Sequence, residues 1–133
     1  MSFIWPVRVY YEDTDAGDVV YHANYLKFFE RARTEMLRAM GYEQDELLAK
    51  EGILFVVRSV QVDYLKPARF NEQLQVSAEV IMAKNASLAF EQEITRGNDV
   101  LCKSIIRIAC LDAGTMRPKA IPKYLLEQLK HEY

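Results

Sequence analysis

Acidic residues cluster near the start of the chain, between Tyr11 and a lone histidine at position 22. Asp13, Asp15 and Asp18 precede His22, and a helical pattern begins shortly after the histidine. The first N–H groups of a helix are unpaired and carry a partial positive charge, so they can polarise a carbonyl oxygen. A carboxylate beside that carbonyl could activate a water molecule or attack the carbonyl itself. On spacing alone, loop acids more often turn the chain or cap a helix.

The same acidic segment does not fit a metal site. A calcium loop beginning at Asp13 would need an acid or amide at its fifth position and a glutamate at its twelfth, where the chain has Gly17 and Asn24. A zinc site is equally disfavoured, because the two histidines, His22 and His131, lie near opposite ends of the chain. The sequence therefore predicts no metal ligands.

Composition narrows the class of protein. The chain has 133 residues, half apolar and 27% charged, which predicts one globular domain over residues 1–133. Its 17 basic and 19 acidic residues give a net charge of −2 with no long run of either sign, which argues against nucleic-acid binding. No apolar run approaches the roughly 20 residues that span a bilayer, and no leader-like segment opens the chain, so we expect a cytoplasmic protein.

The two cysteines, Cys102 and Cys110, lie in one apolar segment. Eight residues of extended strand would hold them about 26 Å apart, too far for a disulfide. Apolar surroundings also raise the pKa of a thiol, which disfavours a catalytic cysteine. We expect both to be core thiols.

Apolar periodicity predicts the elements that position the acidic segment. Trp5–Tyr11 alternates as a strand, and from Tyr25 the apolar positions follow a helical rhythm for 16 residues to Gly41, with Asn24 as the N-cap. The remaining predictions are a short helix at Glu43–Lys50, strands at Ile53–Tyr64, Leu74–Met82, Leu88–Ile94 and Val100–Leu111, and a closing helix at Tyr124–Tyr133.

This order predicts an α+β fold, in which an antiparallel five-stranded sheet wraps around one long central helix. One long helix covers only one face of such a sheet, and two strand edges are left open. We therefore expect a homodimer or a tetramer in which the sheets of neighbouring subunits continue into each other.

The segment Val9–Tyr25, with the sequence VYYEDTDAGDVVYHANY, resembles the active-site signature of the 4-hydroxybenzoyl-CoA thioesterase family of hotdog-fold enzymes, and most closely its YbgC branch. Further similarity at Phe28–Glu35, Phe55–Arg58 and Arg117–Ala120 extends the resemblance over nearly the whole chain. YbgC proteins commonly have a second glycine where this chain has Asp18, which bears on the backbone freedom of the loop.

The resemblance implies a hotdog fold and hydrolysis of an acyl-CoA thioester to the free acid and CoA, without a metal or another cofactor. Asp15 matches the loop carboxylate that acts as nucleophile or general base, and the backbone N–H of His22 matches the position that polarises the thioester carbonyl. Tyr11 and His22 match the side chains that accompany the carboxylate. A related group places its carboxylate on the helix instead, but Glu30 and Glu35 have an ordinary explanation as surface acids facing arginines. We expect the thioester substrate to carry a short to modest acyl group.

Coenzyme A carries phosphates, so its binding groove needs cations. The substrate-binding candidates are Arg58, Ser59, Lys84, Asn85 and Ser87. Lys66 and Arg69 are further cations on nearby turns. The hairpin turn at Lys84 fits best, because the resemblance implies that the nucleotide lies along the dimer surface and contacts such a turn. Each of these positions is explained equally well as a solvated turn or strand edge.

Three alternatives stay open from the sequence. A hotdog dehydratase of β-hydroxyacyl thioesters would also need a carboxylate and a histidine at a helix start. YbgC genes usually accompany the Tol-Pal envelope system, so the resemblance also suggests a non-catalytic adaptor, with the amphipathic segment Tyr124–Tyr133 on a membrane. Finally, an acyl carrier protein could replace CoA as the carrier of the acyl group.

Overall fold

The structure is a computed structural model that describes residues 2–132, so Tyr133, the last residue of the predicted closing helix, lies outside it. The described residues form these elements, in chain order: β1 (Phe3–Arg8), a 3-10 turn η1 (Tyr11–Asp13), α1 (Asn24–Ala39), α2 (Gln44–Glu51), β2 (Ile53–Tyr64), β3 (Gln73–Lys84), β4 (Ser87–Arg96), β5 (Asp99–Asp112) and α3 (Lys123–Glu132).

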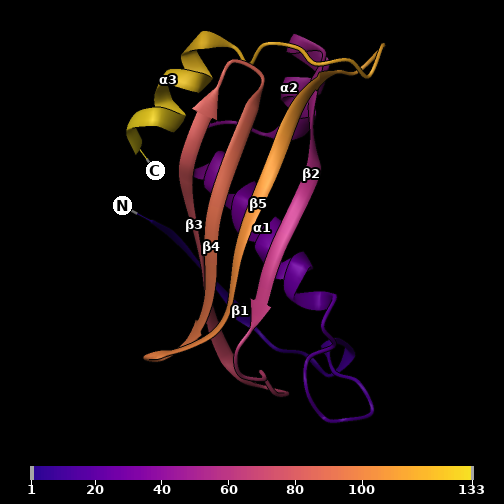
Figure 1. Cartoon of the computed structure of the whole chain (residues 1–133), viewed down its shortest axis with the longest axis vertical. Coiled ribbons are helices and arrows are strands. Elements are labelled where there is room, and N and C mark those ends of the chain that lie inside the picture. Colours follow the sequence, from indigo (N-terminus) through magenta and orange to yellow (C-terminus); the bar gives the residue numbers. More distant parts are fainter. Residues whose placement is uncertain (1, 133) are drawn as a thin grey trace.

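The strands form one antiparallel sheet in the order β1-β3-β4-β5-β2, which curves around α1 (Figure 1). β3, β4 and β5 are joined by tight turns, while β2 pairs with β5 from Ile53 opposite Asp112 to Tyr64 opposite Cys102. β1 and β2 are the two edge strands, so each has one side without a strand partner in this chain. The predicted α+β fold, a five-stranded sheet around one long helix, is confirmed.

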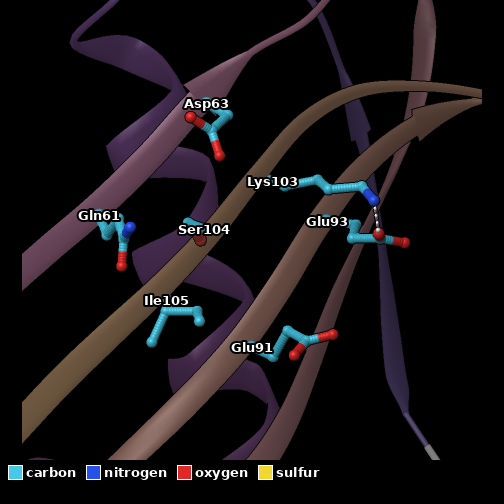
Figure 2. Close-up of a pocket in the computed structure, with 7 residues that line it drawn as sticks. All are labelled: Gln61, Asp63, Glu91, Glu93, Lys103, Ser104 and Ile105. Carbon is cyan, nitrogen blue, oxygen red and sulfur yellow. Dashed lines mark ion pairs between the residues drawn. The ribbon is translucent and has the colours of Figure 1, made fainter.

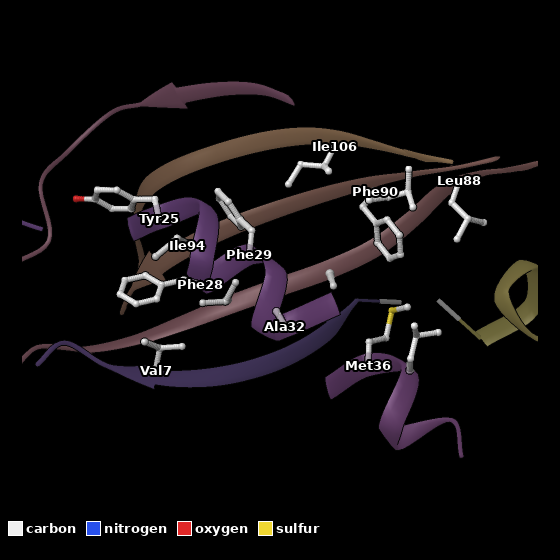
Figure 3. Close-up of a cluster of buried hydrophobic side chains, with 14 of the residues drawn as sticks. Val7, Tyr25, Phe28, Phe29, Ala32, Met36, Leu88, Phe90, Ile94 and Ile106 are labelled. Carbon is white, nitrogen blue, oxygen red and sulfur yellow. The ribbon is translucent and has the colours of Figure 1, made fainter. Parts of the chain in front are cut away.

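The core lies between α1 and the concave face of the sheet (Figure 3). Phe28, Phe29 and Met36 of α1 are almost fully buried, as the helical spacing predicted. They pack against strand residues such as Phe90 and Ile106, which point inward from β4 and β5. The helix is therefore fixed along its length, and with it the position of its N-terminus.

The first strand is shorter than predicted. It ends at Arg8 rather than at Tyr11, because the chain turns into η1. The N–H of Asp13 donates to the carbonyl of Tyr10 at 3.0 Å, and the N–H of Thr14 donates to the carbonyl of Tyr11 at 3.1 Å. Tyr11 thus belongs to the loop that carries the aspartates and not to the sheet.

The closing helix α3 is packed on its own domain. Leu125 and Leu129 of α3 are buried in the core cluster, as is Ile121 just before the helix, and the ring of Tyr124 stacks on Tyr42 with centroids 5.7 Å apart. The apolar side that a membrane surface would need is therefore already covered. Within residues 2–132, no helix is long and apolar enough to cross a bilayer.

Both cysteines are free and buried, as predicted. Burial raises the pKa of the Cys102 thiol to about 12, with the charge of Asp63 as a second cause, and burial also raises the pKa of Cys110.

Because a raised pKa leaves little thiolate at neutral pH, we expect neither cysteine to react with a thiol-specific dye at pH 8 in the native protein. Both should react once a denaturant unfolds the chain. Dye absorbance before and after unfolding measures this, and rapid reaction of either native cysteine would contradict the buried placement.

Candidate active site

Asp13 organises the loop that precedes α1. Its carboxylate accepts the N–H of Tyr10 at 2.8 Å, and its carbonyl accepts both the N–H of Tyr21 and the side-chain amide of Asn24 at 2.9 Å each. These three bonds tie the start of the loop to the start of the helix. Asp13 is therefore a structural residue of the loop.

Asp15 sits at the tip of the same loop, in a tight turn. Its N–H donates to the carbonyl of Val19 at 2.9 Å, and its carbonyl accepts the N–H of Asp18 at 3.0 Å. One carboxylate oxygen, Oδ1, accepts the N–H of Gly17 at 2.8 Å. The other oxygen has no hydrogen-bond partner in residues 2–132. The carboxylate is thus held by one oxygen and open at the other, as a base or nucleophile needs.

Two positions of this turn restrict the residue type. A Cβ at Gly17 would lie 3.2 Å from Oδ1 of Asp15 and would press on the carboxylate. Asp18 has a φ of 63°, in the left-handed region that glycine adopts freely and that aspartate tolerates better than most residues. This backbone conformation explains why the related signature commonly has a glycine at position 18.

The Asp15 carboxylate faces a hollow of about 590 Å³. Tyr11 lines it and is largely exposed, with its ring in edge contact with Phe70 at a centroid distance of 5.8 Å. Arg69 lines the same hollow from the connection between β2 and β3, and its guanidinium makes no ion pair within the described residues. The structure therefore brings Asp15 and Tyr11 together and adds a cation and an aromatic ring.

The start of α1 is uncapped. Ala23 occupies the N-cap position and no side chain caps the helix, so the prediction of Asn24 as the N-cap is wrong. Asn24 is the first helical residue, and its amide is turned toward Asp13 instead. The backbone N–H groups of His22 and Ala23 make no hydrogen bond in the described part of the chain. Both N–H groups are therefore free to bind an external oxygen.

The imidazole of His22 lies in a second hollow, of about 270 Å³. Tyr64, at the end of β2, donates its hydroxyl to the carbonyl of His22 at 2.7 Å, and the hydroxyl of Tyr25 accepts the N–H of Ala68 at 3.0 Å. Burial is the main cause that raises the pKa of both tyrosines, so both stay protonated at neutral pH. The Asp15 and His22 side chains thus line different hollows beside one loop. Tyr64 and Phe70 are the site residues that sequence reasoning missed.

The predicted substrate-binding residues lie away from Asp15 in a single chain. Lys84, Asn85 and Ser87 form the turn between β3 and β4, about 36 Å along β3 from the end of the sheet that carries the Asp15 loop (Figure 1). Arg58 and Ser59 lie midway along the edge strand β2, at a break in its register with β5. None of the five lines the hollow of Asp15 or that of His22.

A further hollow, of about 270 Å³, lies on the outer face of the sheet (Figure 2). Asp63, Glu91 and Glu93 line it, and only Lys103, which pairs with Glu93 at 3.6 Å, offsets their charge. This negative surface would repel the phosphates of CoA. No group of three or more potential metal-ligating side chains is found in residues 2–132.

Comparison with known proteins identifies the class. The thioesterase-like superfamily matches residues 9–129. A probable thioesterase from Bartonella henselae has the same fold, with a TM-score of 0.88 and 34% identity over 92% of this chain and 100% of that one. The chain therefore belongs to the thioesterase-like superfamily, and the predicted hotdog fold is confirmed.

Two curated relatives show which branch of the superfamily this chain resembles. The chain is 47% identical to the acyl-CoA thioesterase YbgC of Haemophilus influenzae, over 98% of this chain and 96% of the relative. It is 46% identical to the acyl-CoA thioester hydrolase YbgC of Escherichia coli, over 96% of each chain. These relatives confirm the resemblance to the YbgC branch.

Proposed function

We propose that this protein hydrolyses acyl-CoA thioesters with short to modest acyl groups, with Asp15 as the catalytic carboxylate and the N-terminus of α1 as the oxyanion site. The family and the named relatives support a thioester hydrolase. The observation that carries the residue assignment is the pairing of two unsatisfied groups beside one loop: a free Asp15 carboxylate oxygen and a free His22 N–H.

In this mechanism the thioester carbonyl lies at the start of α1. The His22 N–H donates to the carbonyl oxygen and stabilises the negative charge that develops on it. Asp15 either removes a proton from a water molecule that attacks the carbonyl carbon or attacks that carbon itself. The C–S bond then breaks and the CoA thiolate leaves and takes up a proton. Attack by water gives the free acid directly, whereas attack by Asp15 leaves a mixed anhydride that a water molecule hydrolyses to the free acid, which regenerates the carboxylate. No cofactor takes part in these steps.

The side chains on either side of the loop have different roles in this proposal. Tyr11 lies in the hollow of Asp15 and offers a hydroxyl there, while the His22 ring lies in the second hollow. We therefore assign the carbonyl contact to the His22 backbone, and to its ring only a place in the wall of the second hollow. Arg69, free beside Asp15, is a cation for the CoA side of the substrate.

A test of the activity is release of free thiol from a panel of acyl-CoA thioesters, with acyl carrier protein thioesters as a second arm. Hydrolysis releases one thiol for each acid formed. A β-hydroxyacyl dehydratase would produce an enoyl thioester and release no thiol. Absence of both products across the panel would favour a non-catalytic adaptor.

The site is completed, in our proposal, by a second copy of the chain paired along β2. This edge strand exposes Val57 and Val60, at 49% and 40%, and both line the groove between β2 and α1. Antiparallel pairing of two β2 edges reverses the second sheet. The turn carrying Lys84 in one copy then lies at the same end of the joined sheet as the Asp15 loop of the other copy.

We expect sedimentation at micromolar concentration to give a dimer or a tetramer, because the exposed apolar edge of β2 is costly to leave in water. Replacing Val57 with Lys should shift the protein toward smaller species, since it would place charges face to face at the contact. Lys at Ile4, an exposed residue of the other edge strand, is the matched control. A wild-type monomer of 15.4 kDa would contradict the paired sheet.

Lys84→Ala should raise KM for acyl-CoA several-fold and leave kcat nearly unchanged, because the turn contacts phosphates and not the carbonyl. The effect should shrink as salt is added. Steady-state kinetics at low and high ionic strength measure both. Lys50→Ala, an exposed lysine on α2, removes the same charge elsewhere as a control, and an unchanged KM in Lys84→Ala at low salt would remove Lys84 from the binding site.

A further inference from the structure

A groove runs between α1 and the edge strand β2, outside the two hollows beside the loop. It consists of two adjoining cavities of about 300 Å³ and 120 Å³, which share Glu30, Arg33 and Val57 as lining residues. Leu26 lines the end nearer the start of the helix and directly follows Tyr25, which lines the hollow of His22, while Val60 lines the groove from β2. Most of the other lining side chains are apolar. The groove thus leads from the proposed carbonyl site along the helix.

Arg33 departs from the sequence pattern at the middle of this groove. Helical spacing puts it among the polar positions of α1, but only 9% of the residue is exposed. Its Nη1 donates to Oε1 of Gln92 at 2.9 Å. Gln92 is fully buried, and its Nε2 donates to the carbonyls of Phe29 and Ser77 at 3.0 and 3.1 Å. Because both N–H groups of the Gln92 amide have acceptors, the amide oxygen must face Arg33. This oxygen holds the Arg33 guanidinium in place.

Arg33 has no contacting counter-ion in residues 2–132. Its one hydrogen-bond acceptor is a neutral amide, and Glu30, one turn away, raises the Arg33 pKa through its charge without forming an ion pair. Desolvation is the larger effect and lowers that pKa to about 10, so the guanidinium stays charged at neutral pH. A buried cation without an anion is costly. Since guanidinium groups have five N–H donors, several remain for a ligand.

We propose that this groove binds the acyl chain of the substrate and that Arg33, where the two cavities meet, binds a carboxylate at the end of that acyl chain, so that the enzyme takes ω-carboxyacyl-CoA thioesters. This inference rests on the proposed thioesterase function. The apolar walls fit a methylene chain, and the buried guanidinium matches a carboxylate in shape and charge. Lys27 lines the same groove and offsets the charge of the exposed Glu30, so the local balance is positive.

The distance from the start of α1 to Arg33 determines how long the acyl group must be. Arg33 lies nine residues after Asn24, which is about 14 Å along the helix axis, and its side chain leans back toward the N-terminus. The arginine side chain covers about 6 Å of this distance, and an extended acyl chain advances about 1.3 Å for each C–C bond of about 1.5 Å, so an acyl group of roughly six to eight carbons bridges the remaining gap of about 8 Å. Shorter dicarboxylic chains would not reach.

The test compares substrates of equal length with and without the terminal carboxylate: suberyl-CoA against octanoyl-CoA, and adipyl-CoA against hexanoyl-CoA. In the wild-type protein we expect kcat/KM to favour at least one carboxylated substrate about tenfold or more, the effect of a charged hydrogen bond in a desolvated site. Arg33→Gln should abolish or reverse this preference, because the charges of Lys27 and Glu30 then cancel and the groove has no buried cation. Arg33→Lys should retain part of it.

Arg31→Gln is the matched control, since Arg31 is exposed on the same helix and its loss removes an equal charge. The substrate preference should stay as in the wild type. A binding readout independent of turnover uses Asp15→Asn protein: suberyl-CoA should raise its melting temperature more than octanoyl-CoA does.

The outcomes separate this inference from the proposed function. Hydrolysis of octanoyl-CoA and hexanoyl-CoA at least as efficient as that of their carboxylated partners would overturn the Arg33 site and leave the thioesterase intact. A carboxylate preference that survives in Arg33→Gln would also overturn it. If no thioester is hydrolysed, the proposed function fails. Equal shifts of the melting temperature of Asp15→Asn protein by suberyl-CoA and octanoyl-CoA would, by themselves, overturn the carboxylate site. The comparison of carboxylated and uncarboxylated substrates in the wild-type protein tests the Arg33 site even if Arg33→Gln does not fold.

Discussion

Asp15→Asn is expected to lower thioesterase kcat/KM by about two to four orders of magnitude, the range that a positioned general base contributes. The fold should survive the change, because the Oδ1 position that accepts the Gly17 N–H can be kept by an amide oxygen. The oxygen that is open in the native protein would become an NH₂ group, which neither removes a proton from water nor attacks a carbonyl. Thiol release measures the rate, and thermal unfolding measures the integrity of the fold.

Asp13→Asn is the matched control for Asp15→Asn. It removes an equal charge two residues earlier in the loop, and an amide oxygen can still accept the N–H of Tyr10. The bonds to Tyr21 and Asn24 use the backbone carbonyl of Asp13 and do not change. We expect a rate within a few-fold of the wild type. A larger loss in Asp13→Asn than in Asp15→Asn, at equal thermal stability, would reassign the catalytic carboxylate.

The sequence was sufficient to predict the helices and strands that depend on the spacing of neighbouring residues. The apolar spacing of Tyr25, Phe28 and Phe29 predicts the buried side of α1, and strand alternation predicts the four later strands with small errors at their ends. Local spacing also suggested a carboxylate beside a helix start, but it did not distinguish Asp15 from Asp13 and Asp18, and that choice depended on the resemblance to the family. The first strand was extended too far since a turn stabilised by Asp13 competes with strand propensity there.

Residues that depend on contacts between distant segments were not predictable in this way. Phe70 reaches Tyr11, and Tyr64 reaches His22, only because the connection between β2 and β3 folds against the loop. Arg33 has the spacing of a surface residue, yet the sheet curves over it and Gln92 lies opposite. Helical periodicity describes one element at a time, so it contains no information on which strand will cover a given side of the helix.

Phe29→Ala is expected to destabilise the protein by about 3–5 kcal/mol, the cost of removing a fully buried aromatic side chain and leaving a cavity. Phe29 is 0% exposed and lies at the centre of the contact between α1 and the sheet (Figure 3). Its backbone carbonyl, which accepts Nε2 of Gln92, is kept, so the change tests packing alone. Since domains are stable by about 5–15 kcal/mol, much of the native stability would be lost. Equilibrium urea unfolding measures the difference.

Phe70→Ala removes the same side chain from a residue that is 55% exposed beside Asp15. It should cost little stability, about 0.5 kcal/mol or less, because a surface ring loses few contacts. Its effect should instead be on KM, since the ring lines the hollow in which we place the CoA side of the substrate. The two phenylalanines therefore separate folding from binding: Phe29 should change the unfolding midpoint and Phe70 the kinetics. Equal losses of stability in the two variants would mean that the curved sheet does not close on α1 as described.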